Sequence, residues 1–164
     1  ANPETASIRQ GDVVDVAFNP QINEFRGERS VQMNILDIRP CCNAACSDEI
    51  AAYHALRQNQ LTATDAAELL PERSTLAMVW RYLAAVPGQI CEAPMCLCRK
   101  IVRWSDAPLS LGQLMTCLDI FADVGLLKYT RQHKYLNITI TAGNQKADLN
   151  TSATMQTLQR MKES

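Results

Sequence analysis

The sequence predicts an α+β fold that is mainly helical, with strands near the N-terminus and helices after them. Two observations predict it. Apolar residues alternate with polar ones along residues 11–39, as in half-buried strands, and from residue 47 onward they recur at helical spacing. A chain of 164 residues can bury a sizeable core, and 47% hydrophobic with 20% charged residues is ordinary for a globular domain. This composition argues against an intrinsically disordered protein.

Strands with a reversal between them are predicted at the N-terminus. Alternation runs through the string GDVVDVAF and returns in SVQMNILDI, and the turn-rich stretch between them reverses at Arg26-Gly27. Arg26 and Arg29 flank this turn, where they either solubilise a hairpin tip or contact a phosphate backbone. A sheet of two or three strands is marginal alone and leaves an exposed edge, so we expect something to cover it.

Capping signals mark the helices. Thr62 with Asp65 and Ser110 with Gln113 have the spacing in which two side chains satisfy each other's backbone amides at a helix start. The residue before Pro71 is pushed out of helical geometry, which ends the helix that Thr62 begins. The expected helices begin near residues 47 and 62, span residues 72–85, 94–104 and 111–124, and close the chain from about residue 152.

A hairpin is predicted after the clearest helix, which spans residues 111–124. Gly125 suits the left-handed position that follows a helix end. The strings LLKYT and YLNITIT then form two strands that turn around residues 132–134. Helix, hairpin wing and closing helix together predict a winged-helix-like module.

Charge is distributed unevenly along the chain, whose net charge is −1. Residues 1–94 hold 7 Lys/Arg and 12 Asp/Glu (−5), whereas residues 95–164 hold 9 and 5 (+4). An anionic partner should therefore meet the C-terminal part.

Cations and aromatic rings interleave on the predicted hairpin. They are Lys128, Tyr129, Arg131, His133, Lys134 and Tyr135. Single-stranded nucleic acid needs both, because cations neutralise phosphates and rings stack on bases. The alternative is a wing whose charged residues are simply solvated. A second basic cluster, at Arg99, Lys100 and Arg103, is likewise either a nucleic-acid contact or a solvated helix face.

No catalytic residue is predicted. The sequence has no phosphate-binding glycine loop, metalloprotease motif or nucleophile-elbow motif, and it has no acidic cluster for a metal nuclease. Its two histidines, His54 and His133, fall in a helix and at a hairpin tip, where neither is expected to serve as a base.

Seven cysteines are an odd number, which does not fit a secreted disulfide framework and favours a reducing cytoplasm. Cys42 with Cys46, and Cys91 with Cys96, have spacings that allow zinc. However, C-x-x-C is absent and both groups adjoin apolar helical stretches, so we expect unliganded thiols and no metal. No apolar run approaches the length of a membrane span, so no membrane partner is expected.

Three strings carry a family resemblance. GDVVDVAFNPQINEFRGERSVQMNILDIRP resembles the end of the OB-fold domain of RecJ, the bacterial exonuclease that degrades single-stranded DNA from 5′ to 3′. LTATDAAELLPERSTLAMVWRYL and LMTCLDIFADVGLL are similar to the extra C-terminal region of RecJ proteins from Firmicutes. The resemblance implies that residues 1–40 are the last strands of an incomplete OB-fold and that residues 41–164 are the helical, winged-helix-like C-terminal domain.

The resemblance implies an accessory role in DNA repair and recombination. The chain would bind or orient single-stranded DNA, or dock a repair protein, while upstream DHH-family nuclease domains of the same protein hold Mn²⁺ or Mg²⁺. The motifs of those domains are absent here, so no cofactor is expected in this chain and it should be inactive alone. Arg26, Arg29 and Gln32 match the family's hairpin string and so take an implied DNA-side role.

Two alternatives stay open. The first is a free-standing winged-helix regulator that reads duplex DNA with residues 111–124 or with the wing at residues 126–141. The second is a protein-interaction module without nucleic-acid contact.

Overall fold

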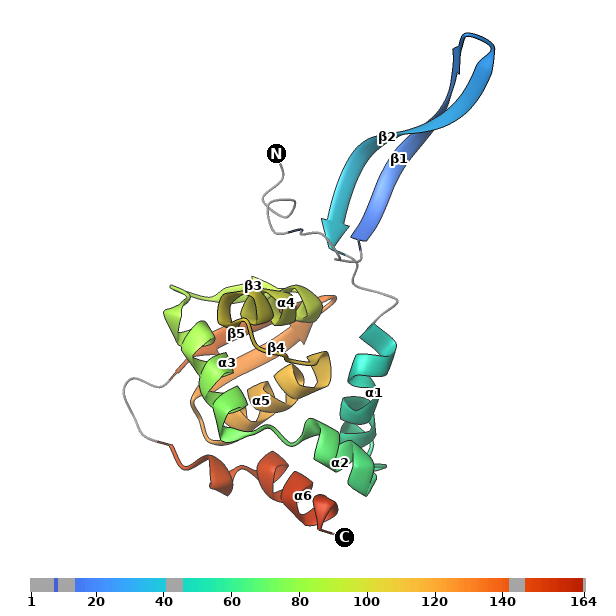
Figure 1. Cartoon of the computed structure of the whole chain (residues 1–164). Helices are drawn as coiled ribbons and strands as arrows, with labels where there is room; N and C mark the ends of the chain where they lie inside the picture. Colours follow the sequence, from blue (N-terminus) through green and yellow to red (C-terminus); the bar gives the residue numbers. More distant parts are fainter. Residues whose placement is uncertain (1–7, 9–13, 41–45, 142–146, 164) are drawn as a thin grey trace. The chain divides into compact units, whose positions relative to one another are not determined.

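The computed structural model describes residues 8, 14–40, 46–141 and 147–163. Its internal contacts divide the chain into two compact units, residues 1–42 and 43–164, and each is described by itself (Figure 1). The first unit holds one β-hairpin, and the second holds helices around a three-stranded sheet. The predicted α+β class is confirmed.

The first unit is a long antiparallel ribbon of β1 (Val14–Phe25) and β2 (Glu28–Pro40). Arg26 and Gly27 form its two-residue turn with φ of 54° and 81°. Two positive φ values match the right-handed twist of the flanking strands, which is why glycine suits the second position. The register shifts beside Ala17, where Leu36 is an extra residue in β2. The predicted reversal at Arg26-Gly27 is confirmed.

The second unit contains the six expected helices. They are α1 (Cys46–Arg57), α2 (Ala63–Leu69), α3 (Arg73–Ala85), α4 (Pro94–Ser105), α5 (Leu111–Asp123) and α6 (Ala153–Lys162). Both predicted capping boxes form: Thr62 with Asp65, and Ser110 with Gln113. A single 3₁₀ turn, η2 (Leu149–Thr151), precedes α6.

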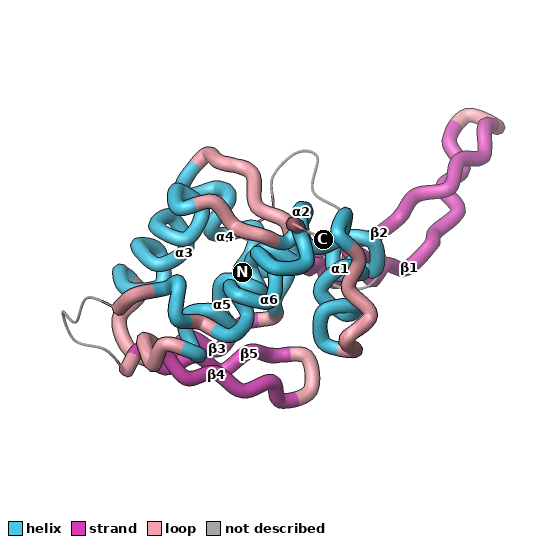
Figure 2. Tube along the Cα trace, turned by 90° about the horizontal axis from the view of Figure 1, so that it is seen from below, coloured by secondary structure: helices cyan, strands magenta, loops and turns pink. Residues whose placement is uncertain are grey.

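The sheet of the second unit has the order β3-β5-β4, with both pairs antiparallel. Its strands are β3 (Ile90–Glu92), β4 (Leu127–Gln132) and β5 (Tyr135–Ile140). The hairpin β4–β5 turns at the predicted place. The strand β3 is not predicted by the sequence, because three residues are too few to show alternation. Figure 2 shows this sheet along one side of the helices.

The helix α5 is the centre of the second unit and contacts α1, α2, α3, α4, α6 and β4. Every residue from Leu111 to Phe121 except Gln113 is buried. A helix that is apolar on all faces must be covered on all faces. Here β4, α3 and α4 contact part of α5, and α1, α2 and α6 contact the rest.

The end of α5 is set by hydrogen bonds that glycine permits. The amide of Leu126 donates to the carbonyl of Phe121 (2.9 Å), and that of Gly125 donates to the carbonyl of Ala122 (3.0 Å). Gly125 has a φ of 76°, which costs a residue without Cβ little. This pair of bonds is the Schellman motif, and it turns the chain directly into β4.

Candidate functional site

The β4–β5 hairpin carries the predicted basic residues, with Lys128 near its base and Arg131 and Lys134 near its turn. Lys128, Arg131 and Lys134 are all exposed. Lys128 is opposite Thr139 and Arg131 is opposite Leu136, so alternation places these two cations on opposite faces of the sheet. Lys134 lies in the turn, with its Nζ 5.4 Å from the centre of the Tyr135 ring.

Tyr129, which the sequence analysis offers as a stacking ring, lies on the face of the hairpin that packs against α5. Its side chain packs against the core, and its hydroxyl donates a hydrogen bond to the carboxylate of Asp119 in α5. Burial, and then that hydrogen bond, raise the pKa of Tyr129 to about 12. The ring is therefore partly buried against the core, and its hydroxyl is held by α5.

Tyr135 is the aromatic residue that the hairpin presents instead. It is half-buried and lies opposite Gln132, on the same face as Lys128. This outer face of the sheet has no buried residue in either strand of the hairpin. We define the hairpin surface as Lys128, Thr130, Lys134, Tyr135 and Asn137. The cross-strand register shows that Tyr135 lies on the outer face of the hairpin and Tyr129 on the opposite face.

The ribbon does not bring its three predicted DNA-side residues together. Arg26 lies in the turn, with its guanidinium carbon 5.3 Å from the centre of the Phe25 ring. Arg29 pairs with Glu24 at 3.6 Å between Nε and Oε2. Gln32 is three residues further along β2, so Arg29 and Gln32 lie on opposite faces.

The two faces of the ribbon differ sharply in chemistry. One face has the cross-strand pairs Phe18–Ile35, Pro20–Met33 and Ile22–Val31. The other has Asn19–Asn34, Gln21–Gln32 and Asn23–Ser30. The apolar face lies open within the described residues: Ile22 is 69% exposed and Val31 is 74% exposed.

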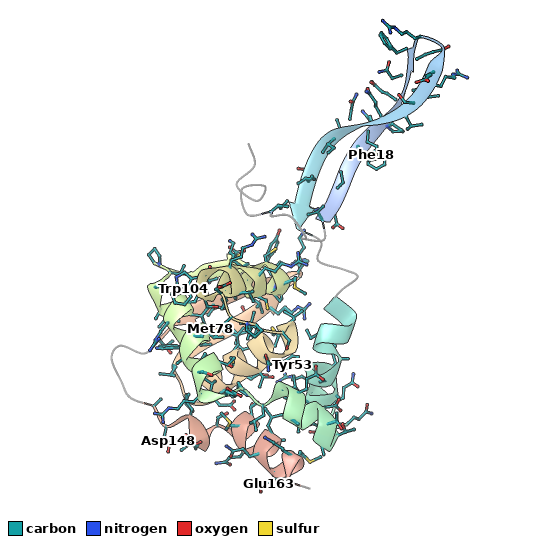
Figure 3. The ribbon with its side chains drawn as sticks, in the orientation of Figure 1. Phe18, Tyr53, Met78, Trp104, Asp148 and Glu163 are labelled. Carbon is teal, nitrogen blue, oxygen red and sulfur yellow. The ribbon has the colours of Figure 1, made fainter. Side chains whose placement is uncertain are left out.

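A groove of about 1080 Å³ opens between α3, the end of α4 and the loop that leads into α5. Trp104 and Met78 line it, and Figure 3 labels both side chains. Among the described residues that line the groove, Arg81 is the one cation and Glu72 is the one carboxylate. We call it the Trp104 groove. The sequence alone does not reveal this groove, because the two stretches that line it, residues 67–81 and 104–113, are far apart along the chain.

A buried carboxylate ties α1 and β4 to α5. Asp119 accepts hydrogen bonds from Tyr53 (2.7 Å) and from Tyr129, and Nη1 of Arg57 lies 4.0 Å from it. Burial, with the nearby Tyr129 and Asp119, raises the pKa of Tyr53 well above its usual range. Both phenols therefore stay protonated and donate, which is a structural arrangement rather than an acid–base pair.

Thiols and histidines form no metal centre within the described residues, where no group of three or more potential ligands occurs. Cys91, Cys96, Cys98 and Cys117 form no disulfide there, and the thiol of Cys98 donates a hydrogen bond to the carbonyl of Leu109 at 3.3 Å. Burial raises the pKa of Cys117 far above its usual value, which makes that thiol unreactive. Of the other pair that the zinc spacing involves, Cys42 lies outside the described residues and Cys46 is the first residue of α1.

Within the described ranges, none of the helices is both long enough and apolar enough to cross a bilayer.

Comparisons of the chain with protein-family models, with curated proteins and with solved structures find no match. Function is therefore inferred from the sequence strings and from the geometry above.

Proposed function

We propose that the chain is an accessory, DNA-binding part of a RecJ-like exonuclease that acts in DNA repair and recombination. The observation that carries this proposal is the β1–β2 ribbon. Two long strands with one apolar face cannot shield that face from water by themselves, so such a ribbon belongs to a larger sheet or barrel. In the family that the strings of residues 11–40 resemble, an OB-fold has strands at this place.

The second unit is proposed to be a winged-helix-like domain. Its elements follow each other as α3–β3–α4–α5–β4–β5, and its sheet has the order β3-β5-β4. Both support this proposal, because winged-helix domains arrange three helices and a three-stranded sheet in the same order. The helix α5 then stands where such domains place the helix that enters the major groove. Since α1, α2 and α6 contact α5 and its residues are buried, the wing is the part left to meet nucleic acid.

This burial disfavours the regulator that reads duplex DNA with residues 111–124. Base readout needs polar side chains on an exposed helix face, and between Leu111 and Phe121 only Gln113 is not buried. The hairpin surface instead offers Lys128 and Lys134 for phosphates and the Tyr135 ring for a base, with Arg131 on the other face of the tip. That combination suits a single strand.

The test is binding of a labelled single-stranded oligothymidylate, measured by fluorescence anisotropy at two salt concentrations. We expect the triple variant K128A/R131A/K134A to bind more weakly and to show a flatter salt dependence, because each phosphate contact contributes to the slope. Tyr135→Ala should weaken binding and leave the slope almost unchanged, because stacking releases no counterions.

The matched control removes three positive charges elsewhere in the second unit, as R73A/R160A/K162A. It should bind nearly as wild type. If both triple variants lose affinity equally, the loss comes from the lower net charge of the protein, and a binding site on the hairpin is contradicted. If wild type binds no oligothymidylate at low salt, the protein-interaction alternative replaces the DNA-binding role.

A further inference from the structure

We infer that the Trp104 groove is a second contact for single-stranded nucleic acid, in which one base stacks on the indole of Trp104. This inference rests on the proposed function and adds a site that is separate from the hairpin. The stacked base would lie at the end of α4, and the adjoining sugar and phosphate would follow the groove along α3.

The exposure of Trp104 is the first support. Its side chain is 54% exposed, although a ring of this size is usually buried in a domain with a core this large. The ring is also held in place: its centre lies 5.7 Å from that of Tyr82, at 72° between the planes. A fixed aromatic ring open to solvent is what single-strand binding proteins offer to a base.

The chain contains a natural contrast in its other tryptophan. Trp80 is half-buried, with its ring centre 5.3 Å from that of the core residue Phe121. The fold therefore uses Trp80 for packing, whereas most of Trp104 faces solvent.

The remaining lining fits a nucleotide better than an apolar peptide. It includes the hydroxyl groups of Ser74, Thr75, Ser105 and Ser110, of which the three serine hydroxyls also hydrogen-bond within the protein. The amide of Gln113 lines it too, but donates to the carbonyl of Glu68 and accepts from the amide of Ser110. Neutral polar groups of this kind hydrogen-bond to base edges and sugar hydroxyls. Arg81, an exposed residue of α3, supplies a charge for a phosphate.

The carboxylate of Glu72 lines the same groove and would repel a phosphate there. Removing its charge should therefore change binding in the opposite direction to removing the charge of Arg81. Glu72 is the N-terminal cap residue of α3, yet its side chain makes no capping hydrogen bond. Its hydrogen bond comes from the hydroxyl of Ser74, at 3.3 Å, and glutamine can accept that bond as well. Glu72→Gln therefore removes the charge and keeps the local structure.

The experiment is a fluorescence titration of the whole chain with short oligothymidylate in the Trp80→Phe background, where Trp104 is the only indole. We expect the oligothymidylate to quench Trp104 emission, and the quenching to saturate at the same concentration as the anisotropy signal. The Trp104→Phe variant, which keeps Trp80, should show little quenching. Trp104→Ala should bind roughly tenfold more weakly, as the loss of one stacked base predicts. Arg81→Gln should weaken binding, and Glu72→Gln should tighten it.

Three other outcomes would overturn the groove as a binding site. Binding that leaves Trp104 emission unchanged, with Trp104→Ala as tight as wild type, overturns the groove while the hairpin site and the proposed function stand. Weaker binding in both Arg81→Gln and Glu72→Gln overturns it too, because a phosphate contact requires opposite signs. Absence of any oligothymidylate binding removes the proposed function and the groove together.

Discussion

The hydroxyl of Tyr53 in α1 lies 2.7 Å from a carboxylate oxygen of Asp119 in α5, although 66 positions separate the two residues in sequence. Asp119 is 8% exposed and also accepts from Tyr129 in β4. One carboxylate thus joins the first helix of the second unit, its central helix and its hairpin. A buried charge is tolerated only when such donors surround it.

Tyr53→Phe should destabilise the chain by about 1.5–3 kcal/mol, the usual contribution of a hydrogen bond to a charged acceptor. Urea denaturation followed by circular dichroism measures it. Tyr135→Phe is the matched control, because it removes the same atom from a residue on the outer face of the sheet, and it should change stability little. Equal losses in the two variants would contradict a special role for the Tyr53–Asp119 bond.

Alkaline pH should unfold the chain through Tyr129. Burial and the bond to Asp119 raise its pKa from 10.0 to about 12, so the folded state holds this proton longer than the unfolded state does. The stabilisation is complete below pH 10 and is lost as the pH rises from about 10 to 12. Denaturation midpoints across that range should fall less steeply for Tyr129→Phe than for wild type; parallel profiles would refute this.

Acid should loosen α6 through Asp123. Partial burial opposes ionisation, but hydrogen bonds from the Ser152 hydroxyl (2.7 Å) and the Thr154 amide (2.9 Å) lower the pKa of Asp123 below its usual 3.8. Its stabilisation is therefore present above pH 3.8 and is lost as the pH falls further. Hydrogen exchange of α6 should accelerate below that pH in wild type. Asp123→Asn should exchange faster already at neutral pH, whereas the exposed control Asp106→Asn should not.

Residues 43–164 should fold without the ribbon. Among the residues that the structure describes, the buried core residues lie between Ile50 and Leu158. Expressed alone, this segment should unfold cooperatively at the same denaturant midpoint as the whole chain. It should also bind less of a hydrophobic fluorescent dye, because the exposed apolar face of the ribbon is gone. A non-cooperative transition would show that the first unit contributes to the core.

Purified chain should not release nucleotides from single-stranded DNA in the presence of Mn²⁺ or Mg²⁺, because its sequence lacks DHH-type motifs. The gene is expected to encode such motifs upstream, which sequencing of the locus decides. Steady metal-dependent degradation by the chain alone would overturn the accessory role. A start codon near residue 1 would favour the free-standing regulator.

Part of the candidate site could be foreseen and part could not. Spacing alone showed that Lys128 and Arg131 could not share a strand face, because alternation is a local property of the backbone. It could not show that Tyr129 turns inward and Tyr135 outward. That depends on which face of the hairpin α5 covers, through a carboxylate ten residues away from Tyr129. The Trp104 groove could not be predicted for the same reason, since residues 67–81 and 104–113 come together only in the folded chain.

Short strings of the sequence predict the local elements: the capped starts at Thr62 and Ser110, the glycine end of α5, and the ribbon turn at Arg26-Gly27. Each depends on side chains and dihedral angles within a few residues, so each can be read from a short string. No short string predicts that β3 joins the sheet, that α5 is covered by helices and sheet, or that Tyr129 packs against α5. These outcomes depend on contacts between distant segments, where burial of apolar surface outweighs local preference.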